Sequence, residues 1–365
     1  MKTNTLTLTT ARAVALAIVA SLMLAGCTTR ATAESNESGS TGTVAAELRL
    51  GYLANITHAP ALVGVDRGII ARDLGETKLS TEVFNAGPAE IEALSAGAID
   101  AAYVGPSPAI KSYIQSRGAS LRVISGAAIG GAELVVRPGI TKVSQLKGTT
   151  LATPQLGNTQ DTALRYFLKT RGLTSSLTGA GDVAITPTDN ANTLALFKSG
   201  RIDGAWLPEP WASRLVLEAQ GHVLVSEESL WPHGTFPTTV LVVNAAYLRA
   251  HPATVEALVR GNLEAIDWIN ANPIIAPGVI NAALDKAVGA PLAPGVLARS
   301  LSTVKFTVDP IAASTKTLLA HSVAVGTGRT GTTRGLYALG SLNRLLTESG
   351  RATVVDDESA AGGSR

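Results

Sequence analysis

Short β-rich runs alternate with helical runs along most of the chain, and this alternation constrains the fold more than any other feature. Strands are predicted over residues 48–53, 79–84, 101–104, 121–126 and 133–137, with helices over residues 59–70, 88–96 and 108–117. Alternation of this kind is typical of α/β domains, in which parallel sheets carry helices on both faces.

The same alternation restarts near Thr149. Strands are predicted at residues 149–153, 183–186, 204–206 and 238–243, with helices at 158–171, 191–199, 209–219 and 252–270. Helix, glycine, Ile-Asp and a short apolar strand occur in this order in both halves, around Gly97 and Gly200, and glycine commonly ends a helix. This repeated order is either the usual way in which a helix ends before a strand in α/β proteins, or a sign of two similar lobes facing one another across a cleft. About 320 residues suffice for two lobes with their own cores.

The first residues are typical of a signal peptide. Lys2 and Arg12 precede an apolar run at residues 13–25, which is too short to span a bilayer. The run ends in Leu24-Ala25-Gly26-Cys27, which resembles a bacterial lipobox. We expect a signal peptide at residues 1–26, lipid attachment at Cys27, and a flexible polar tether at residues 27–46. A buried apolar role for Cys27 is disfavoured because no core-forming sequence follows it.

Charge and cysteine content limit the partners and the chemistry. The chain has 30 Lys+Arg and 28 Asp+Glu, so removal of Lys2 and Arg12 leaves 28 of each. A net charge near zero argues against a nucleic-acid partner. Cys27 is the only cysteine, so no disulfide can form within one chain.

The turns that follow the predicted strands are the candidate ligand sites, because ligands of open α/β sheets bind beyond the carboxyl ends of the strands. They lie at residues 54–60, 85–88, 105–108, 153–160 and 207–211 and are rich in Gly, Pro, Ser, Thr and Asn. Such turns expose backbone N–H groups at helix N-termini, which attract anions. Each polar residue in these turns could instead serve only as a helix cap. Gly130-Gly131 could instead be only a turn between strands.

Several motifs in these turns, taken in order, resemble one known family. They are Gly51-Tyr52, His58-Ala59-Pro60, and the segments at residues 101–108, 152–159 and 206–211. The chain from residue 48 to 273 resembles the nitrate/sulfonate/taurine group of ABC-importer substrate-binding lipoproteins, and within it the aliphatic-sulfonate binders.

The resemblance implies a periplasmic-binding-protein-like (type II) fold of two α/β lobes with a ligand cleft and two crossover segments. It places the first lobe at residues 47–142 and 244–355, the second at 143–243, crossings near 138–147 and 238–244, and a disordered tail at 356–365. It implies a monomer, lipid-anchored on the extracytoplasmic face of the cell membrane, that delivers a small organic anion to an ABC permease. The residues on the family's pocket turns are Asn55, Thr57, His58, Ser107, Gly131, Asn158, Thr159 and Glu209.

Two other functions stay open from the sequence. The superfamily includes a thiamin-pyrimidine synthase that uses histidines and a cysteine-rich motif, but here Cys27 stands alone and the histidines have no metal-like spacing. We therefore expect no enzyme activity, no cofactor and no metal. A nitrogenous ligand, such as a pyrimidine precursor, would use the tryptophans and Glu209. The absence of arginine from the turns favours a monovalent sulfonate over a divalent anion.

Overall fold

The computed structural model describes residues 43–356. The predicted signal peptide, Cys27 and most of the predicted tail lie outside this range. Thr43 and Ala45, at the end of the predicted tether, are bound to the folded body. Thr43 Oγ1 donates to the carbonyl of Ala250, and the amide of Ala45 donates to Thr254 Oγ1. The prediction of a flexible tether is therefore wrong for its last residues.

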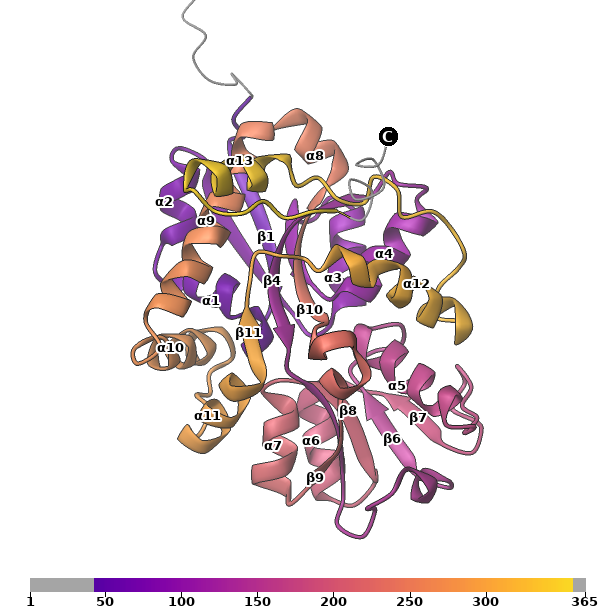
Figure 1. Ribbon diagram of the computed structural model, residues 1–365. Helices are drawn as coiled ribbons and strands as arrows, with labels where there is room; N and C mark the ends of the chain where they lie inside the picture. The colour runs from indigo at the N-terminus through magenta and orange to yellow at the C-terminus, as the bar shows by residue number, and fades with distance from the viewer. Residues whose placement is uncertain (1–42, 357–365) are drawn as a thin grey trace, which may run out of the picture. The chain divides into compact units, whose positions relative to one another are not determined.

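The first lobe is built on a six-stranded sheet with the strand order β11-β4-β10-β3-β1-β2 (Figure 1). β1 runs parallel to β2 and β3, while β10 is antiparallel to β3 and β4. The strands are β1 (Glu47–Leu53), β2 (Lys78–Phe84), β3 (Ala101–Val104), β4 (Leu121–Gly130), β10 (Pro237–Asn244) and β11 (Val304–Phe306).

The second lobe is built on a five-stranded sheet with the order β7-β6-β8-β5-β9. β6 runs parallel to β7 and β8, and β5 is antiparallel to β8 and β9. The strands are β5 (Ala132–Val136), β6 (Thr150–Thr153), β7 (Ala184–Pro187), β8 (Gly204–Pro208) and β9 (His222–Ser226). The sequence did not predict β9 or β11, which are short edge strands.

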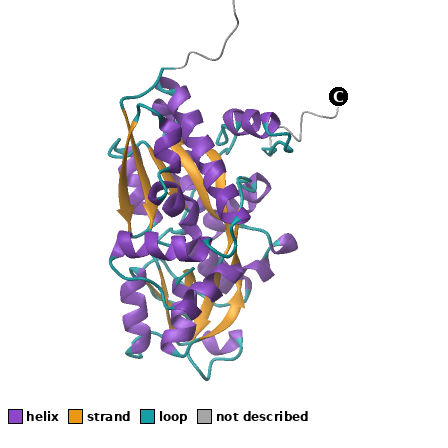
Figure 2. Ribbon diagram, turned by 90° about the vertical axis from the view of Figure 1, so that its left-hand side faces the viewer, coloured by secondary structure: helices purple, strands orange, loops and turns teal. Residues whose placement is uncertain are grey.

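Helices surround both groups of strands (Figures 1 and 2). Those that cover the first sheet include α1 (Ala59–Asp66), α2 (Ile69–Leu74), α3 (Gly87–Ser95), α4 (Pro106–Gln115), α8 (Ala245–Ala250), α9 (Pro252–Ala271) and α13 (Gly340–Glu348). The second sheet is covered by α5 (Thr159–Thr170), α6 (Asn190–Lys198) and α7 (Trp211–Ala219). The remaining helices are α10 (Ala276–Val288), α11 (Pro294–Thr303), α12 (Thr315–Ala324) and the short 3-10 helices η1 (Ile56–His58), η2 (Val143–Leu146), η3 (Glu227–Leu230), η4 (Pro232–Gly234) and η5 (Ala312–Ser314).

Each sheet is covered on both faces by separate hydrophobic clusters. Leu48, Leu50, Leu258 and Ile266 belong to one cluster of the first lobe, while Val104, Ile110 and Leu318 belong to the other. In the second lobe, Trp206 packs with α5 and Leu207 packs with α6 and α7. The α/β class and the two-lobed architecture are thus as predicted.

Two predicted features need correction. The helix predicted at residues 59–70 is divided at Gly68, which has a positive φ of 66°. The crossings also lie elsewhere than predicted, because β5 belongs to the second sheet and β10 to the interior of the first. The first crossing is at Gly130-Gly131, where both residues have positive φ and separate β4 from β5. The segment near residues 138–147, where the resemblance implied a crossing, follows β5 within the second lobe.

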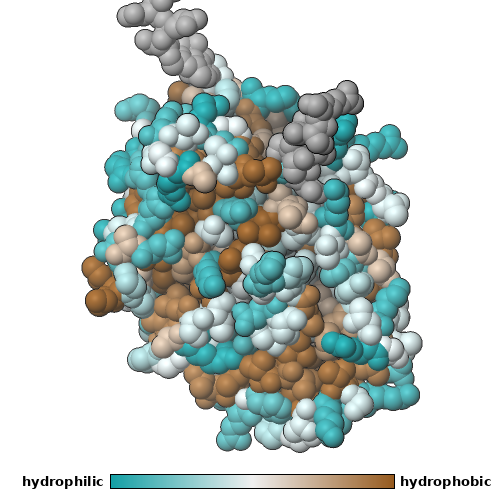
Figure 3. Space-filling model, in the orientation of Figure 1, coloured by the Kyte–Doolittle hydropathy of each residue, from teal (hydrophilic) through white to brown (hydrophobic). Residues whose placement is uncertain are grey.

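The α9–α10 turn carries the exposed Ile274 and Ile275, which are 93% and 59% accessible. Figure 3 shows that the hydrophobic residues visible on this face gather beside α10 and over the second lobe. Within residues 43–356, none of the helices combines the length and the apolar character needed to cross a membrane.

Candidate functional site

The carboxyl ends of parallel strands from both sheets face two adjoining cavities. The first-lobe side is formed by the turns after β1, β2 and β3, and the second-lobe side by the turns after β6, β7 and β8. Asn55, Asn85 and Asn190 line both cavities. This is the position at which open α/β sheets bind ligands.

The smaller cavity is polar and narrow. It has a volume of about 20 Å³, which is room for about one water molecule. No Asp, Glu, Lys or Arg of the described chain lines it, and its polar groups are amides, hydroxyls and one imidazole. Its lining is Leu53, Asn55, Thr57, His58, Asn85, Gly105, Pro154, Asn158, Gln160, Asn190, Pro208 and Thr238.

Helix N-termini from both lobes begin at this polar cavity. α4 starts after Gly105, and α5 starts after its N-cap Asn158, whose Oδ1 accepts from the Gln160 amide at 3.1 Å. Gly105 and Asn158 line the cavity themselves. Helix N-termini carry partial positive charge and backbone donors, so the cavity favours an anion although it holds no cationic side chain.

His58 presents an uncharged imidazole to the cavity. Its Nδ1 accepts a hydrogen bond from the Leu53 amide at 3.2 Å, so the proton of the neutral ring lies on Nε2. Burial lowers the pKa of His58 to about 3. The ring therefore stays neutral at physiological pH and can donate one hydrogen bond without adding a charge.

Hydrogen bonds between the lobes hold the cavity closed. Trp211 Nε1 of the second lobe donates to Asn55 Oδ1 of the first at 2.9 Å. The Ser107 amide at the start of α4 donates to Thr159 Oγ1 at the start of α5, at 3.4 Å. A Cβ at Gly105 would clash with that same Thr159 oxygen, so glycine is needed where the two helices meet.

The larger cavity is mainly apolar. It has a volume of about 460 Å³ and opens next to the polar one. Aromatic and aliphatic side chains form most of its wall, with Arg214 and the exposed Asp189 also present. Its lining beyond the three shared asparagines is Ala54, Val83, Phe84, Asp189, Ala191, Asn192, Pro210, Trp211, Arg214, Leu284, Val288, Ala290 and Leu292. Arg214 lies over the Trp211 ring at 4.9 Å and is paired with Glu218 at 3.0 Å.

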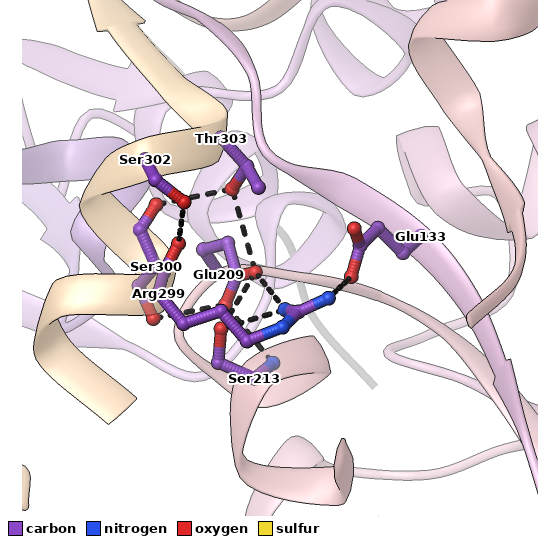
Figure 4. A network of polar contacts seen from close by, with 7 residues as sticks. All are labelled: Glu133, Glu209, Ser213, Arg299, Ser300, Ser302 and Thr303. Carbon is purple, nitrogen blue, oxygen red and sulfur yellow. Dashed lines mark hydrogen bonds and ion pairs between the residues drawn. The ribbon is translucent and has the colours of Figure 1, made fainter. Parts of the chain in front are cut away.

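Glu209 is engaged elsewhere, in a network centred on Arg299 of α11 (Figure 4). Arg299 Nη1 lies 3.0 Å from Glu209 Oε1, and Nη2 lies 2.6 Å from Glu133 Oε2. The Ser213 amide and hydroxyl, together with the Ser300 hydroxyl, donate to the same Glu209 carboxylate at 3.1, 2.9 and 3.0 Å.

This network accounts for the whole Glu209 carboxyl group. Burial, and then the charge of Glu133, raise its pKa, while Ser213 and Arg299 oppose the rise. The Glu209 side chain is fully buried and lines neither cavity. The carboxylate joins the start of α7 to α11 through Ser213, Arg299 and Ser300.

Sequence comparison places this architecture among known proteins. The model of the NMT1-like family matches residues 42–281, which is well over half of the chain. The chain belongs to the NMT1-like family.

This NMT1-like protein is similar to curated proteins that are named as binding proteins. It is 27% identical over 195 residues to a putative binding protein of Brucella abortus, covering 53% of this chain and 58% of the relative. It is also 27% identical over 215 residues to the taurine-binding periplasmic protein of Escherichia coli, covering 59% and 64%. These matches span less than two thirds of the relatives' own length.

Solved structures confirm the periplasmic-binding-protein-like fold. The alkanesulfonate-binding protein SsuA from Xanthomonas axonopodis pv. citri, bound to MOPS, aligns with a TM-score of 0.67 at 22% identity, covering 79% of this chain and 96% of that one. The nitrate-binding protein NrtA from Synechocystis aligns with a TM-score of 0.64 at 16% identity, covering 79% and 83%. At these identities the likeness concerns the fold.

The NMT1-like chain brings four of the eight residues predicted from the sequence into the polar cavity: Asn55, Thr57, His58 and Asn158. Ser107 and Thr159 do not line this cavity but join the lobes through their hydrogen bond. Gly131 occupies the first crossing, where its φ is 68° and a Cβ would clash with Val304, and Glu209 belongs to the Arg299 network. Asn55 makes no capping hydrogen bond, whereas Asn158 both caps α5 and lines the cavity.

Sequence reasoning missed Asn190 as a shared lining residue and Arg214 as a wall of the larger cavity. It included the turn that begins at Asn85 without selecting Asn85 itself, and it considered Trp211 only as one of the tryptophans available to a nitrogenous ligand. Asn85 and Asn190 each follow a parallel strand directly or within three residues. That position after a strand was the available signal. The sequence offered no such signal for Arg214, because Arg214 lies on α7 beyond the turn.

Proposed function

We propose that this protein is the extracytoplasmic solute-binding component of an ABC importer, and that it captures an aliphatic sulfonate. The observation that carries the proposal is the junction of an uncharged polar cavity with a larger apolar one. The donors and helix N-termini of the first suit the charge of a sulfonate head, and a hydrocarbon tail fits the second. Because the first has room for about one water molecule, the lobes must move apart for the head group to enter it. Nitrate and bicarbonate have no group to fill the apolar cavity.

The test is a chain-length series. Binding of ethane-, propane- and butanesulfonate, nitrate and bicarbonate would be measured by calorimetry and thermal shift. Each added methylene should lower Kd about fourfold, since burying one contributes ~0.8 kcal/mol. The best ligand should add ~2.7 kcal/mol of stability at a hundredfold excess over Kd. Nitrate or bicarbonate binding as tightly as butanesulfonate would overturn the proposal.

A matched pair of variants locates the tail. Leu292 lines the apolar cavity, while Leu217 on α7 is 52% exposed and does not. Leu292→Ser should flatten the dependence on chain length, whereas Leu217→Ser should leave it unchanged. Equal effects of the two substitutions would place the tail elsewhere.

An amine-bearing sulfonate such as taurine is a second candidate, and Asp189 is the observation that favours it. Glu209, which the sequence suggested as the partner of an ammonium group, is already paired with Arg299. Asp189 lines the larger cavity, within reach of the shared Asn190. If taurine is the ligand, Asp189→Asn should weaken taurine at least tenfold and leave ethanesulfonate unaffected; equal binding of both ligands by both proteins would remove this candidate.

We also propose that Cys27 is lipidated and holds the protein at the membrane beside its permease. The support is the lipobox-like segment Leu24-Ala25-Gly26-Cys27. Mass spectrometry of the mature N-terminus and membrane fractionation would test this. Cys27→Ser should release the protein into the soluble fraction, and unchanged fractionation would refute the anchor.

We propose that the protein acts as a monomer without catalysis. Its curated relatives are binding proteins, and the described residues contain no group of three His, Cys, Asp or Glu side chains placed to hold a metal. Light scattering should give the mass of one chain, and the bound sulfonate should be recovered chemically unchanged after prolonged incubation.

A further inference from the structure

A third cavity lies apart from the two described above. It has a volume of about 190 Å³ and shares no lining residue with them. Its walls come from α5, from η3 with the adjoining Trp231, and from α12 near the C-terminus, which lies beside α5 in Figure 1. The lining is Ala163, Tyr166, Phe167, Thr170, Glu227, Leu230, Trp231 and His321.

Aromatic rings form most of the wall. Tyr166 and His321 stack with their centroids 3.6 Å apart at an interplanar angle of 17°. Trp231 lies 5.7 Å from His321 at 49°, so the rings stand at an angle around one space. Tyr166, Trp231 and His321 are only half-buried, which leaves the cavity reachable from solvent. Burial lowers the pKa of His321, so this ring is neutral.

A buried carboxyl group also lines the cavity. Glu227 is 1% exposed, and Trp206 Nε1 donates to its Oε2 at 2.7 Å. The Trp231 side chain is its other hydrogen-bond donor. Within residues 43–356, no Lys, Arg or His acts as a charge partner for Glu227. Burial raises the pKa of Glu227 to about 7, against the two hydrogen bonds that lower it.

We propose that this cavity is a binding site for a small quaternary ammonium cation. Aromatic faces attract cations through their ring quadrupoles, and such cages are how proteins recognise quaternary ammonium groups. Glu227 supplies the charge opposite to that of the cation, and no cationic side chain among residues 43–356 neutralises it. An anion would be repelled by this carboxylate, and an uncharged apolar molecule would leave it without a counter-charge. The site is separate from the sulfonate site and does not depend on the function proposed above.

Calorimetric titration of the whole protein with choline, and with its uncharged isostere 3,3-dimethyl-1-butanol, tests the proposal. It is done at pH 8, above the pKa of Glu227; His321 and Tyr166 are the other titratable groups that line the cavity. Choline should bind one per chain and at least tenfold more tightly than the isostere. No choline binding, or equal binding of the two, would overturn the proposal.

Two variants assign the binding to the cavity. Glu227→Gln keeps an oxygen that can accept from the two tryptophans but removes the charge, so it should weaken choline at least tenfold. Glu228→Gln, at the exposed neighbouring carboxylate, should leave choline unaffected. If both variants bind choline like the parent protein, the cation is held elsewhere and the proposal fails. Asn158→Ala, in the sulfonate site, should also leave choline binding unaffected.

Discussion

The polar cavity and the Arg299 network are two buried polar regions that both include the carboxyl end of β8, and they differ in what remains unpaired. In the network every group around Glu209 is bound to a protein partner: Arg299, Ser213 and Ser300 surround its carboxylate. In the cavity, Asn190 Oδ1 is buried without a hydrogen-bond partner among residues 43–356, and the same holds for Ser107 Oγ at the start of α4. Buried polar groups are normally paired, so unused capacity at a strand end indicates a ligand position, whereas a satisfied carboxylate indicates a structural one.

The largest expected effect comes from breaking the satisfied region. Arg299→Met would leave Glu133 and Glu209, which are 5% and 0% exposed, without their shared cation. Removing one partner of a buried ion pair costs ~3–5 kcal/mol. Urea denaturation should show a loss of that size, with sulfonate affinity retained below the transition.

Arg344→Met is the matched control, because Arg344 is 55% exposed and pairs with Glu256 at the surface. Such pairs contribute ~0–1 kcal/mol. Equal losses in the two variants would mean that the Arg299 network contributes no more to the free energy of unfolding than a surface ion pair.

A charge placed in the unsatisfied region should damage binding and leave the fold intact. Asn55→Asp keeps an oxygen that can accept from Trp211 Nε1, but it puts a carboxylate where the anion is proposed to sit. Like charges in contact cost several kcal/mol, so Kd for butanesulfonate should rise about a hundredfold or more, as measured by calorimetry.

Asn192→Asp is the control for that substitution, because Asn192 is exposed and lines only the larger cavity. It should weaken binding much less. An Asn55→Asp protein that binds normally would exclude the polar cavity as the head-group site.

Glu90 sharpens the comparison, because it is buried and wholly unsatisfied yet lines neither cavity. Neither carboxyl oxygen has a hydrogen-bond partner among residues 43–356, and burial raises the pKa of Glu90 well above the usual value. Its folded-state pKa exceeds its unfolded one, so its unfavourable effect on stability is absent below pH 4.5 and grows as pH rises through the folded pKa. Glu90→Met should therefore stabilise the protein by ~1–3 kcal/mol near pH 8 and less at pH 4.

Thermal unfolding at the two pH values would measure this difference. Glu92→Met on the same helix is the control, since Glu92 is exposed. A gain from Glu90→Met that is the same at both pH values would mean that the Glu90 charge is not the cause. A loss of stability would mean that Glu90 has a partner.

The fold was largely predictable from the sequence, because strand–helix alternation is a local pattern that each segment carries by itself. The strand predicted at residues 101–104 has the bounds of β3, and the strand at 48–53 and the helix at 252–270 each differ from the structure by one residue at one end. The crossings were not predictable in this way. β4 and β5 form one nearly continuous apolar stretch, and only two positive φ angles at Gly130 and Gly131 separate them.

The site was predictable only in part, for a related reason. Proximity to a strand end selected Asn55, His58 and Asn158 as well as Glu209, because all of them occupy such turns. The partner that removes Glu209 from the site is Arg299, ninety residues later in the chain. Local sequence contains no sign of a hydrogen bond formed at that separation.

Ser107 gives the smallest and most discriminating test, because one of its polar groups is paired and the other is not. Its amide donates to Thr159 across the lobes, while its hydroxyl is buried without a partner. Ser107→Ala keeps the amide, so unfolding without ligand should change by less than ~0.5 kcal/mol. If the hydroxyl binds the sulfonate, losing that hydrogen bond should cost ~1 kcal/mol, a roughly fivefold rise in Kd. Thr162→Ala would remove a hydroxyl already paired with Thr327 and should lower stability without changing Kd. An unchanged Kd for Ser107→Ala would assign Ser107 to the contact between α4 and α5 alone.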